Sequence, residues 1–271
     1  RVPATLLIRW SGRLAPGVAA KDMMLRLCAA LDMSRTNYRV VEYAGEAVTA
    51  LEMAERMVLT NMAAELAAKT GLIAADEKTV AALAEAGAEV AGALDWQGDA
   101  DAEFEDVIEF DAAALPPLVA APHDPANVDD AAAFADVAID QAYIGACTGA
   151  KLADLRMAAQ VLKGRRVAPG ARLLVAPAST GITRAAAADG TLATLTAAGA
   201  ILMPSGCGAC AGLGAGILAR DEVCISSTSR NFQGRMGAAS AKVYLGSAYT
   251  VAASAVAGAI RDPRELLAET A

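Results

Sequence analysis

Apolar and polar positions along the chain alternate between the spacing of strands and the spacing of helices. Short β-rich runs are followed by longer segments in which apolar side chains recur every three or four positions. This alternation predicts an α/β protein with largely parallel sheets. In the first half the pattern predicts strands at 5–10, 39–43, 72–74 and 107–110, and helices at 21–31, 46–69 and 78–88.

The second half repeats the alternation without any repeat of sequence. A glycine-rich segment follows the third of its predicted strands. The strands are expected at 138–144, 172–176, 201–203, 223–226 and 242–245, and the helices at 152–162, 183–188, 191–198 and 248–260. In the first half, Gly71 stands just beyond the long helix at 46–69 and is expected to end it.

A proline-rich stretch separates the two halves. Between Leu115 and Asp130 the chain has four prolines, and a Pro-His-Asp-Pro segment cannot continue a helix. We therefore expect two layered α/β/α domains, at 1–121 and 137–271, joined by a linker at 122–136.

Composition and charge narrow the classes of protein. The chain has 271 residues, of which 55% are hydrophobic and only 4% aromatic, which suits two layered cores built from small side chains. The formal net charge is -8 without any run of Lys or Arg, which argues against a nucleic-acid partner. No apolar run reaches about 18 residues, and residues 1–10 lack the apolar core of a signal peptide. We expect a cytoplasmic protein that does not enter a membrane.

Three of the five cysteines lie in glycine-rich surroundings. Cys207 and Cys210 form a C-x-x-C motif within Ser-Gly-Cys-Gly-Ala-Cys-Ala-Gly, and Cys147 follows the predicted strand at 138–144. Loops at strand ends can wrap a ligand, and glycines let main-chain N–H groups approach it closely. An odd number of widely spaced cysteines favours reduced thiols over a disulfide framework.

Four interpretations of these thiols remain open on the residues alone. They could simply pack in the protein interior. Cys207 and Cys210 could be a thioredoxin-like redox pair, although that fold places its motif after the first long strand. Zinc would need four ligands, and only Cys147 and His123, which lies in the proline linker, could complete the set. Three thiolates without a fourth ligand suit a 4Fe-4S cluster whose open iron acts as a Lewis acid.

Several motifs resemble the aconitase superfamily, most of all the large subunits of 3-isopropylmalate dehydratase and homoaconitase. They occur in the order seen in that family, and the resemblance spans essentially the whole chain. These motifs are Val41–Glu46 (Val-Glu-Tyr-Ala-Gly-Glu), Asn61–Glu65 (Asn-Met-Ala-Ala-Glu), Ile144–Gly149 (Ile-Gly-Ala-Cys-Thr-Gly), Gly206–Cys210 (Gly-Cys-Gly-Ala-Cys) and Arg230–Arg235 (Arg-Asn-Phe-Gln-Gly-Arg).

The resemblance implies an iron–sulfur hydro-lyase. Such an enzyme dehydrates and rehydrates a hydroxy di- or tricarboxylic acid such as isopropylmalate or homocitrate, in amino-acid biosynthesis. By this resemblance Cys147, Cys207 and Cys210 hold the 4Fe-4S cluster. Arg230 and Arg235 match the arginines near the substrate carboxylates, and a guanidinium fork binds a carboxylate through two parallel hydrogen bonds.

Two further residues carry implied roles, and two positions depart from the family pattern. Glu42 matches a glutamate near the open iron that could handle a proton, and Asn61 matches an asparagine near the cluster. The alternative for both is an ordinary solvated side chain. Gly149 and Ser229 stand where the family usually has asparagines. The loss of two amides is expected to affect substrate preference.

The family's complete site draws on parts that this sequence lacks. Its large subunit begins with a domain that carries an Asp-Ser-His motif, and its catalytic serine belongs to a mobile swivel domain, often a separate small subunit. We therefore expect such a domain or subunit as a partner and a site that is incomplete without it. A non-catalytic aconitase-like module and a C-x-x-C thiol-redox protein are the competing hypotheses. Cys28 and Cys224 are expected in the core.

Overall fold

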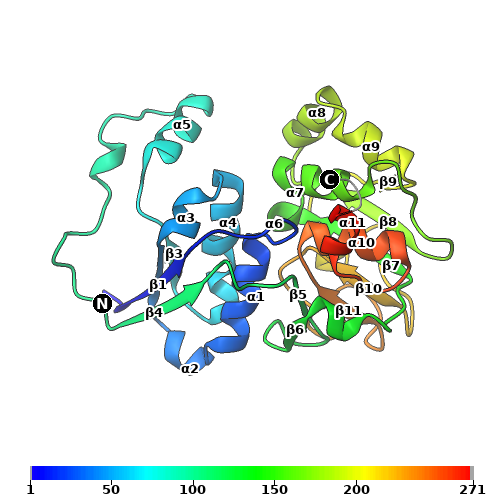
Figure 1. Cartoon of the computed structure of the whole chain (residues 1–271), viewed down its shortest axis with the longest axis horizontal. Coiled ribbons are helices and arrows are strands. Elements are labelled where there is room, and N and C mark those ends of the chain that lie inside the picture. Colours follow the sequence, from blue (N-terminus) through cyan, green and yellow to red (C-terminus); the bar gives the residue numbers. More distant parts are fainter. Residues whose placement is uncertain (1, 269–271) are drawn as a thin grey trace. The chain divides into compact units, whose positions relative to one another are not determined.

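The computed structural model describes residues 2–268 and divides into two compact units (Figure 1). The first consists of the segment that ends at Leu14 together with Leu31–Ala114, and the second of Ala15–Ala30 together with the chain from Leu115 onward. Each unit contains a largely parallel sheet with helices, so the predicted α/β class is confirmed. None of the helices formed by residues 2–268 is long and apolar enough to cross a membrane.

The first unit is built on a four-stranded parallel sheet with the order β3-β2-β1-β4. Leu6, Ile8 and Trp10 of its central strand are almost fully buried, as are Leu59 and Met62 of the longest helix. The strands are β1 (Thr5–Ser11), β2 (Val40–Ala44), β3 (Thr70–Leu72) and β4 (Asp106–Asp111), and the helices are α2 (Met33–Thr36), α3 (Glu46–Ala50), α4 (Met53–Met62), η1 (Ala63–Leu66), α5 (Glu77–Glu85) and η2 (Ala93–Asp95).

The prediction of a single helix at 46–69 is wrong, because this segment forms three separate helices, α3, α4 and η1. Leu51 has an extended backbone between α3 and α4, where its carbonyl accepts a hydrogen bond from the buried Arg56. Ala67, in the left-handed region with φ 59°, ends the last turn in place of Gly71. Gly71 lies in β3, where a Cβ would stand 2.9 Å from Thr60 Cα. The glycine is therefore needed for close packing of β3 on α4.

The second unit contains a seven-stranded sheet with the order β6-β5-β11-β10-β7-β8-β9. The five strands from β11 to β9 are parallel, and β5 and β6 pair antiparallel at one edge. The strands are β5 (Leu118–Ala120), β6 (Val128–Asp130), β7 (Gln141–Gly145), β8 (Arg172–Ala176), β9 (Ile201–Leu202), β10 (Val223–Ser226) and β11 (Lys242–Leu245).

The domain boundary expected at 122–136 needs correction. This segment contributes β6 and the turn η3 (Ala131–Phe134) to the second unit. Prolines are tolerated beside short edge strands, where fewer N–H groups must donate. The helix α1 (Ala20–Ala30) also belongs to the second unit, where it contacts β5 and β6. A helix that leaves one unit to pack on the other cannot be recognised from hydrophobic spacing.

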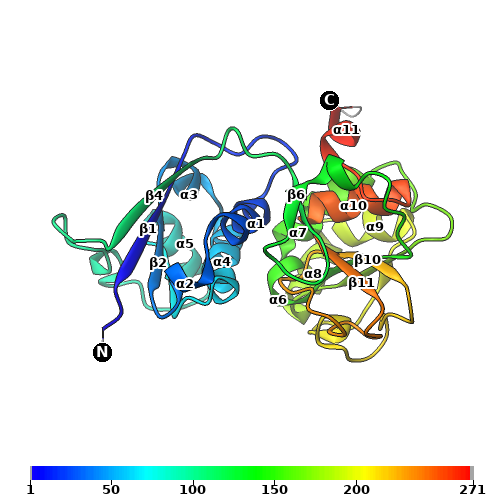
Figure 2. The same cartoon turned by 90° about the horizontal axis from the view of Figure 1, so that it is seen from below.

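The two faces of the second sheet are covered differently. Ala142 and Ile144 of β7 share one buried core with α7, α8, α9 and α10. Side chains alternate along a strand, so Gln141 and Tyr143 point to the other face, which loops cover. Figure 2 shows these loops, in yellow and orange, on the side away from α10. The helices are α6 (Ala146–Gly149), α7 (Leu152–Leu162), α8 (Thr180–Ala188), α9 (Thr191–Ala197), η4 (Gly208–Ala211), α10 (Ala248–Ala257) and α11 (Pro263–Ala268).

Candidate active site

The cysteines and arginines predicted as site residues lie in three loops of the second unit, each after a parallel strand. The β7 loop (residues 145–151, from the end of β7 through the short helix α6) contains Cys147. The β9 loop (203–216, which includes η4) contains Cys207 and Cys210, and the β10 loop (227–235) contains Arg230 and Arg235. The carboxyl ends of parallel strands meet at one edge of the sheet. In open α/β sheets ligands bind at this edge, where the strand order reverses.

That reversal lies between β7 and β10. The strands β8 and β9 continue from β7 on one side, and β10 and β11 lie on its other side. The β7 and β10 loops therefore leave the sheet at the point where the topology predicts a ligand site.

Hydrogen bonds join the β7 loop to the β10 loop. The Ser227 hydroxyl accepts from the Gly145 N–H at 3.0 Å and donates to the Gly149 carbonyl at 2.8 Å. The Ser229 hydroxyl donates to the Thr148 hydroxyl oxygen at 2.9 Å. The loop with the first cysteine and the loop with both arginines thus form one connected structure.

The two departures from the family pattern lie within this contact. A Cβ at Gly149 would stand 2.3 Å from the Ser227 carbonyl oxygen, so the loops approach too closely for a side chain there. Ser229 is buried, and its hydroxyl is used by Thr148. Gly149 and Ser229 therefore have a structural role in closing the two loops on each other.

The β9 loop contacts the side chain of Tyr143 on β7. Cys207 is exposed and Cys210 is buried, and the Cys210 N–H donates to the Cys207 carbonyl at 3.1 Å. The Tyr143 hydroxyl donates to the same carbonyl at 3.3 Å. Burial, together with the nearby Cys210, raises the pKa of Tyr143 to about 12, so its hydroxyl remains a donor at neutral pH. This bond fixes the C-x-x-C turn against the strand that leads to Cys147.

The β10 loop is anchored at both ends of its arginine segment. Asn231 is fully buried and donates to the Ala121 carbonyl at 2.8 Å. At the other end a Cβ at Gly212 would lie 2.9 Å from the Arg235 carbonyl oxygen, so this segment packs on the β9 loop. Arg230 and Arg235 are both half-buried. Among the residues that the structure describes, the buried Nε of Arg235 finds no hydrogen-bond acceptor, so it is a donor suited to an anionic ligand.

Glu42 and Asn61 belong to the first unit. Glu42 is partly buried in the middle of β2, in register with Leu7 on β1 and Leu72 on β3. Asn61 is exposed in the last turn of α4. The structure thus joins the cysteines to the arginines within one unit, while the roles of Glu42 and Asn61 stay predictions.

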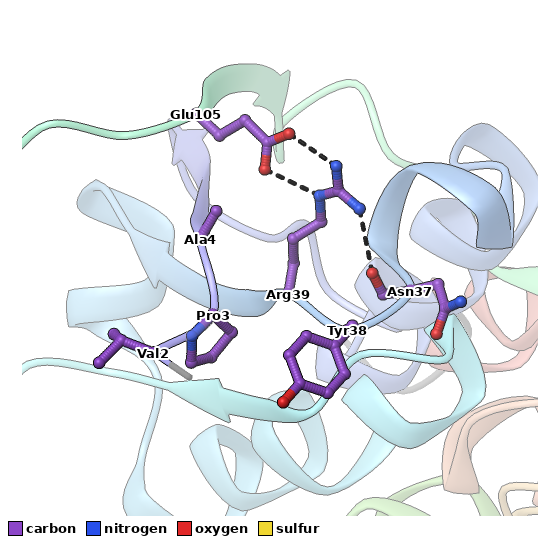
Figure 3. Close-up of a pocket in the computed structure, with 7 residues that line it drawn as sticks. All are labelled: Val2, Pro3, Ala4, Asn37, Tyr38, Arg39 and Glu105. Carbon is purple, nitrogen blue, oxygen red and sulfur yellow. Dashed lines mark hydrogen bonds and ion pairs between the residues drawn. The ribbon is translucent and has the colours of Figure 1, made fainter.

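A pocket of about 410 Å³ in the first unit contains none of the predicted site residues (Figure 3). Its charged groups neutralise each other, because Arg39 donates to Glu105 through two nitrogens at 2.8 and 2.6 Å. Ala4 and Arg39 immediately precede β1 and β2, so the pocket lies at the amino ends of the strands, the edge opposite to the usual ligand site. It is lined by Val2, Pro3, Ala4, Asn37, Tyr38, Arg39 and Glu105.

The predicted cluster cysteines do not form a site for a single metal ion in the part of the chain that the structure describes. Within residues 2–268 no three His, Cys, Asp or Glu side chains converge where one metal ion could be held. An iron–sulfur cubane makes a different demand, because each thiolate binds its own iron atom and the ligands surround the cluster. Cys147, Cys207 and Cys210 come from two loops at one sheet edge, and a cluster held by all three stays a prediction. The other two, Cys28 and Cys224, are buried, and burial raises the pKa of Cys224 to about 12.

Tyr143 and Ser227 contribute to the site and were not predicted from the sequence. Strand alternation could have indicated Tyr143, because its neighbours Ala142 and Ile144 are the apolar members of the opposite face. No local pattern marks Ser227, since its partners lie 82 and 78 positions away in the chain.

Comparison with known proteins identifies relatives over almost the entire chain. The family model for the aconitase family (aconitate hydratase) matches residues 1–133 and 128–258. The chain is 42% identical over 267 residues to the 3-isopropylmalate dehydratase large subunit 2 of Archaeoglobus fulgidus, covering 98% of this chain and 64% of that protein. The large subunit 1 of Pyrococcus furiosus is 41% identical over 269 residues, covering 98% and 63%.

The chain therefore spans under two thirds of the length of these relatives. Among solved structures, the holo-form of Thermococcus kodakaraensis aconitase X overlaps 84% of this chain and 49% of its own, with a TM-score of 0.45 and 11% identity. A likeness at that level supports no argument about this chain. The match of the family model across both units is decisive, and the chain belongs to the aconitase family.

Proposed function

We propose that this chain is the part of an aconitase-type hydro-lyase that holds a 4Fe-4S cluster and binds the substrate carboxylates. The observation that carries the proposal is the meeting of two loops at the strand-order reversal between β7 and β10. One of them supplies Cys147 and the other Arg230 and Arg235. A metal group and an anion can be held side by side there. The proposed substrate is a hydroxy di- or tricarboxylic acid such as isopropylmalate or homocitrate.

Cys147, Cys207 and Cys210 would hold the cluster. When bound, the cluster supplies an open iron that acts as a Lewis acid toward the hydroxyl and a carboxylate of the substrate. The protein keeps the ligands in place through its own contacts: Tyr143 anchors the C-x-x-C turn, and Ser227 anchors the β7 loop. The exposure of Cys147 and Cys207 leaves these thiols accessible for loading.

Arg230 and Arg235 would orient the substrate through its carboxylates. The chain carries a formal net charge of -8, so its overall field repels a polyanion and local cations must supply the attraction. Arg235 is half-buried and its Nε has no acceptor among the described residues, which suits it to this role because hydrogen bonds from a guanidinium to a carboxylate are charge-assisted. We assign proton handling to Glu42 and a place near the cluster to Asn61 on the family resemblance.

The complete enzyme would need further parts. The relatives are named large subunits, which supports a small subunit as the partner of this chain. The remaining length of those relatives supports an additional domain in the large subunit. The swivel domain or small subunit would then supply the catalytic serine, and the reaction would serve amino-acid biosynthesis in the cytoplasm.

A thiol-redox function is the second candidate. It is favoured by one observation: in the C-x-x-C motif Cys207 is exposed and Cys210 is buried, as in a dithiol with an accessible and a resolving thiol. The two functions make opposite predictions for Cys147→Ser. A redox pair keeps its activity in this variant, whereas the hydro-lyase loses iron and activity together.

The proposed function is tested in the complete enzyme with isopropylmalate and homocitrate as substrates. Dehydration creates a carbon–carbon double bond conjugated to a carboxylate, which is followed by ultraviolet absorbance. Arg235→Lys keeps the charge but loses the planar fork, and we expect a higher KM with unchanged iron content. An iron-loaded wild-type enzyme that dehydrates neither acid would contradict this substrate class.

A further inference from the structure

Two lysines of the second unit are buried at the base of the candidate site. Lys21 on α1 is 6% exposed and Lys151, just before α7, is 9% exposed. A buried ammonium group is costly unless it is paired and hydrogen-bonded. Both ammonium groups donate to main-chain carbonyls of the loops that form the site, so each has a specific structural partner.

Lys21 supports the β10 loop. Its ammonium donates to the Thr228 carbonyl at 2.6 Å and to the Ser227 carbonyl at 3.3 Å. Thr228 lies two residues before Arg230 and beyond the end of β10 at Ser226. A buried carbonyl there has no partner on a neighbouring strand and needs a side-chain donor. The contact spans more than 200 positions of the sequence.

The helix that carries Lys21 is itself fixed. The neighbouring Asp22 is fully buried and accepts from the Ala19 and Leu118 N–H groups, both at 2.8 Å. These bonds attach the start of α1 to β5 within the same unit. Lys21 therefore reaches the β10 loop from a rigid base.

Lys151 supports the β7 loop in the same manner. Its ammonium donates to the Thr148 carbonyl at 2.6 Å and lies 3.4 Å from the Asp154 carboxylate. Asp154 also accepts from the Lys151 N–H at 2.9 Å, which holds the lysine at the start of α7. Thr148 follows Cys147 directly, so this bond fixes the carbonyl beside the first cysteine.

We propose that the two lysines are positioning residues with separate tasks, Lys21 for the substrate arginines and Lys151 for Cys147. The inference rests on the proposed function and adds residues to it. Neither lysine is assigned a contact with substrate or cluster. Lys21 acts through a carbonyl two residues from Arg230, and Lys151 acts through the carbonyl of the residue after Cys147. A charge-assisted hydrogen bond is about twice as strong as a neutral one. Such a bond from each lysine suits the task of keeping its loop in one position when a ligand binds.

The test compares neutral variants of similar size with an exposed control. Lys21→Met keeps the packing but removes the donors, and Lys151→Met does the same in the β7 loop. Lys242→Met serves as the control, because Lys242 is exposed on β11 in the same unit. A displacement of about 1 Å in a substrate-orienting group costs on the order of 100-fold in rate.

In the complete enzyme we expect Lys21→Met to lower kcat/KM by about 100-fold, mainly through KM, at unchanged iron content. Lys21→Arg, which retains charged donors, should recover part of the loss. Lys21→Gln, which has a neutral amide donor group and a milder effect on folding, should lie between Lys21→Met and Lys21→Arg. Lys151→Met should lose iron, and Lys242→Met should match the wild type. A wild-type KM in Lys21→Gln and Lys21→Met, or iron loss in Lys21→Met equal to that in Lys151→Met, would overturn the assignment.

Hydrogen exchange on the chain itself separates this inference from the proposed function. Without any cluster or substrate, Lys21→Met should raise amide exchange most at 227–230 and Lys151→Met most at 147–149, with a smaller rise in the other segment because Ser227 and Ser229 join the two loops. Unchanged exchange in both variants refutes the positioning roles. Absence of iron and activity in the wild-type enzyme refutes the proposed function instead.

Discussion

The closest approach between the β7 and β10 loops predicts that Gly149 tolerates no side chain. A Cβ at this position would lie 2.3 Å from the Ser227 carbonyl oxygen and 2.5 Å from its hydroxyl, about 1 Å inside ordinary contact. The carbonyl cannot move freely, because Lys21 donates to it and the Ser227 N–H donates to the Tyr143 carbonyl at 3.0 Å. The loops must therefore separate to admit even alanine.

The expected cost of Gly149→Ala follows from these contacts. Overpacking of a closed site costs about 1–3 kcal/mol, and the Ser227 hydroxyl would lose its bond to the Gly149 carbonyl, worth about 1 kcal/mol. We expect the second unit to lose about 3 kcal/mol of unfolding free energy. Gly181→Ala is the matched control in the same unit. It lies in α8, where a Cβ has only the Ser179 hydroxyl nearby at 3.6 Å, so alanine should be neutral or mildly stabilising.

Urea denaturation can assign the loss to one unit. Trp10 and Trp96, the two tryptophans of the chain, belong to the first unit. Tryptophan fluorescence therefore follows the first unit, and circular dichroism follows both. Gly149→Ala should lower the dichroism midpoint and leave the fluorescence midpoint unchanged. A dichroism midpoint equal to that of Gly181→Ala would refute the close approach of the two loops.

Two further predictions concern the first unit and use tryptophan fluorescence. The pKa of Asp76 is lowered from 3.8 to about 2, chiefly by Arg56, and its partly exposed side chain reduces the expected gain to about 1 kcal/mol. This stability is present above about pH 4 and is lost as the pH falls toward 2. The variant Asp76→Asn should therefore be less stable than the wild type at pH 6 and similar to it at pH 2. An equal loss of stability at both pH values would contradict the ion pair. Gly71→Ala should lower the unfolding free energy by about 1–3 kcal/mol, because the added Cβ would contact Thr60. The control Gly98→Ala, which has no atom within 4 Å of the added Cβ, should leave it unchanged. Equal urea midpoints for the two variants would argue against the packing of β3 on α4.

Strongly periodic segments of the fold were predictable from the sequence alone. The strands at 172–176, 223–226 and 242–245 and the helix at 152–162 occur at the expected residues. Each of these segments has a clear apolar pattern and is followed by lysine, proline, serine or glycine, so local and tertiary preferences agree.

Other parts of the fold depend on contacts that the local pattern does not contain. The apolar spacing continues across Leu51, where the bond from Arg56 to its carbonyl accompanies the break between two helices. The short strands β5 and β6 are set among prolines and pair with each other at the edge of the sheet. The helix α1 packs on the second unit although its sequence lies within the first.

The candidate site shows the same division. The places of the cysteines and arginines after predicted strands could be read from the sequence, whereas their roles came from the family resemblance and stay predictions. Their grouping also needs the strand order, which sets the β7 and β10 loops side by side. The buried positions of Lys21 and Lys151 were not predictable, because lysine is normally exposed and its carbonyl partners are identified only by the tertiary fold.

Iron and sulfide content, measured under anaerobic conditions, tests whether Cys147, Cys207 and Cys210 hold one cluster. We expect about three to four irons per chain in the complete enzyme, with a broad brown absorption band. Serine in place of any of these three cysteines should abolish it, whereas Cys28→Ser should retain it. An iron-free wild-type enzyme, or full iron retention in Cys147→Ser, would show that these three cysteines do not hold a cluster together.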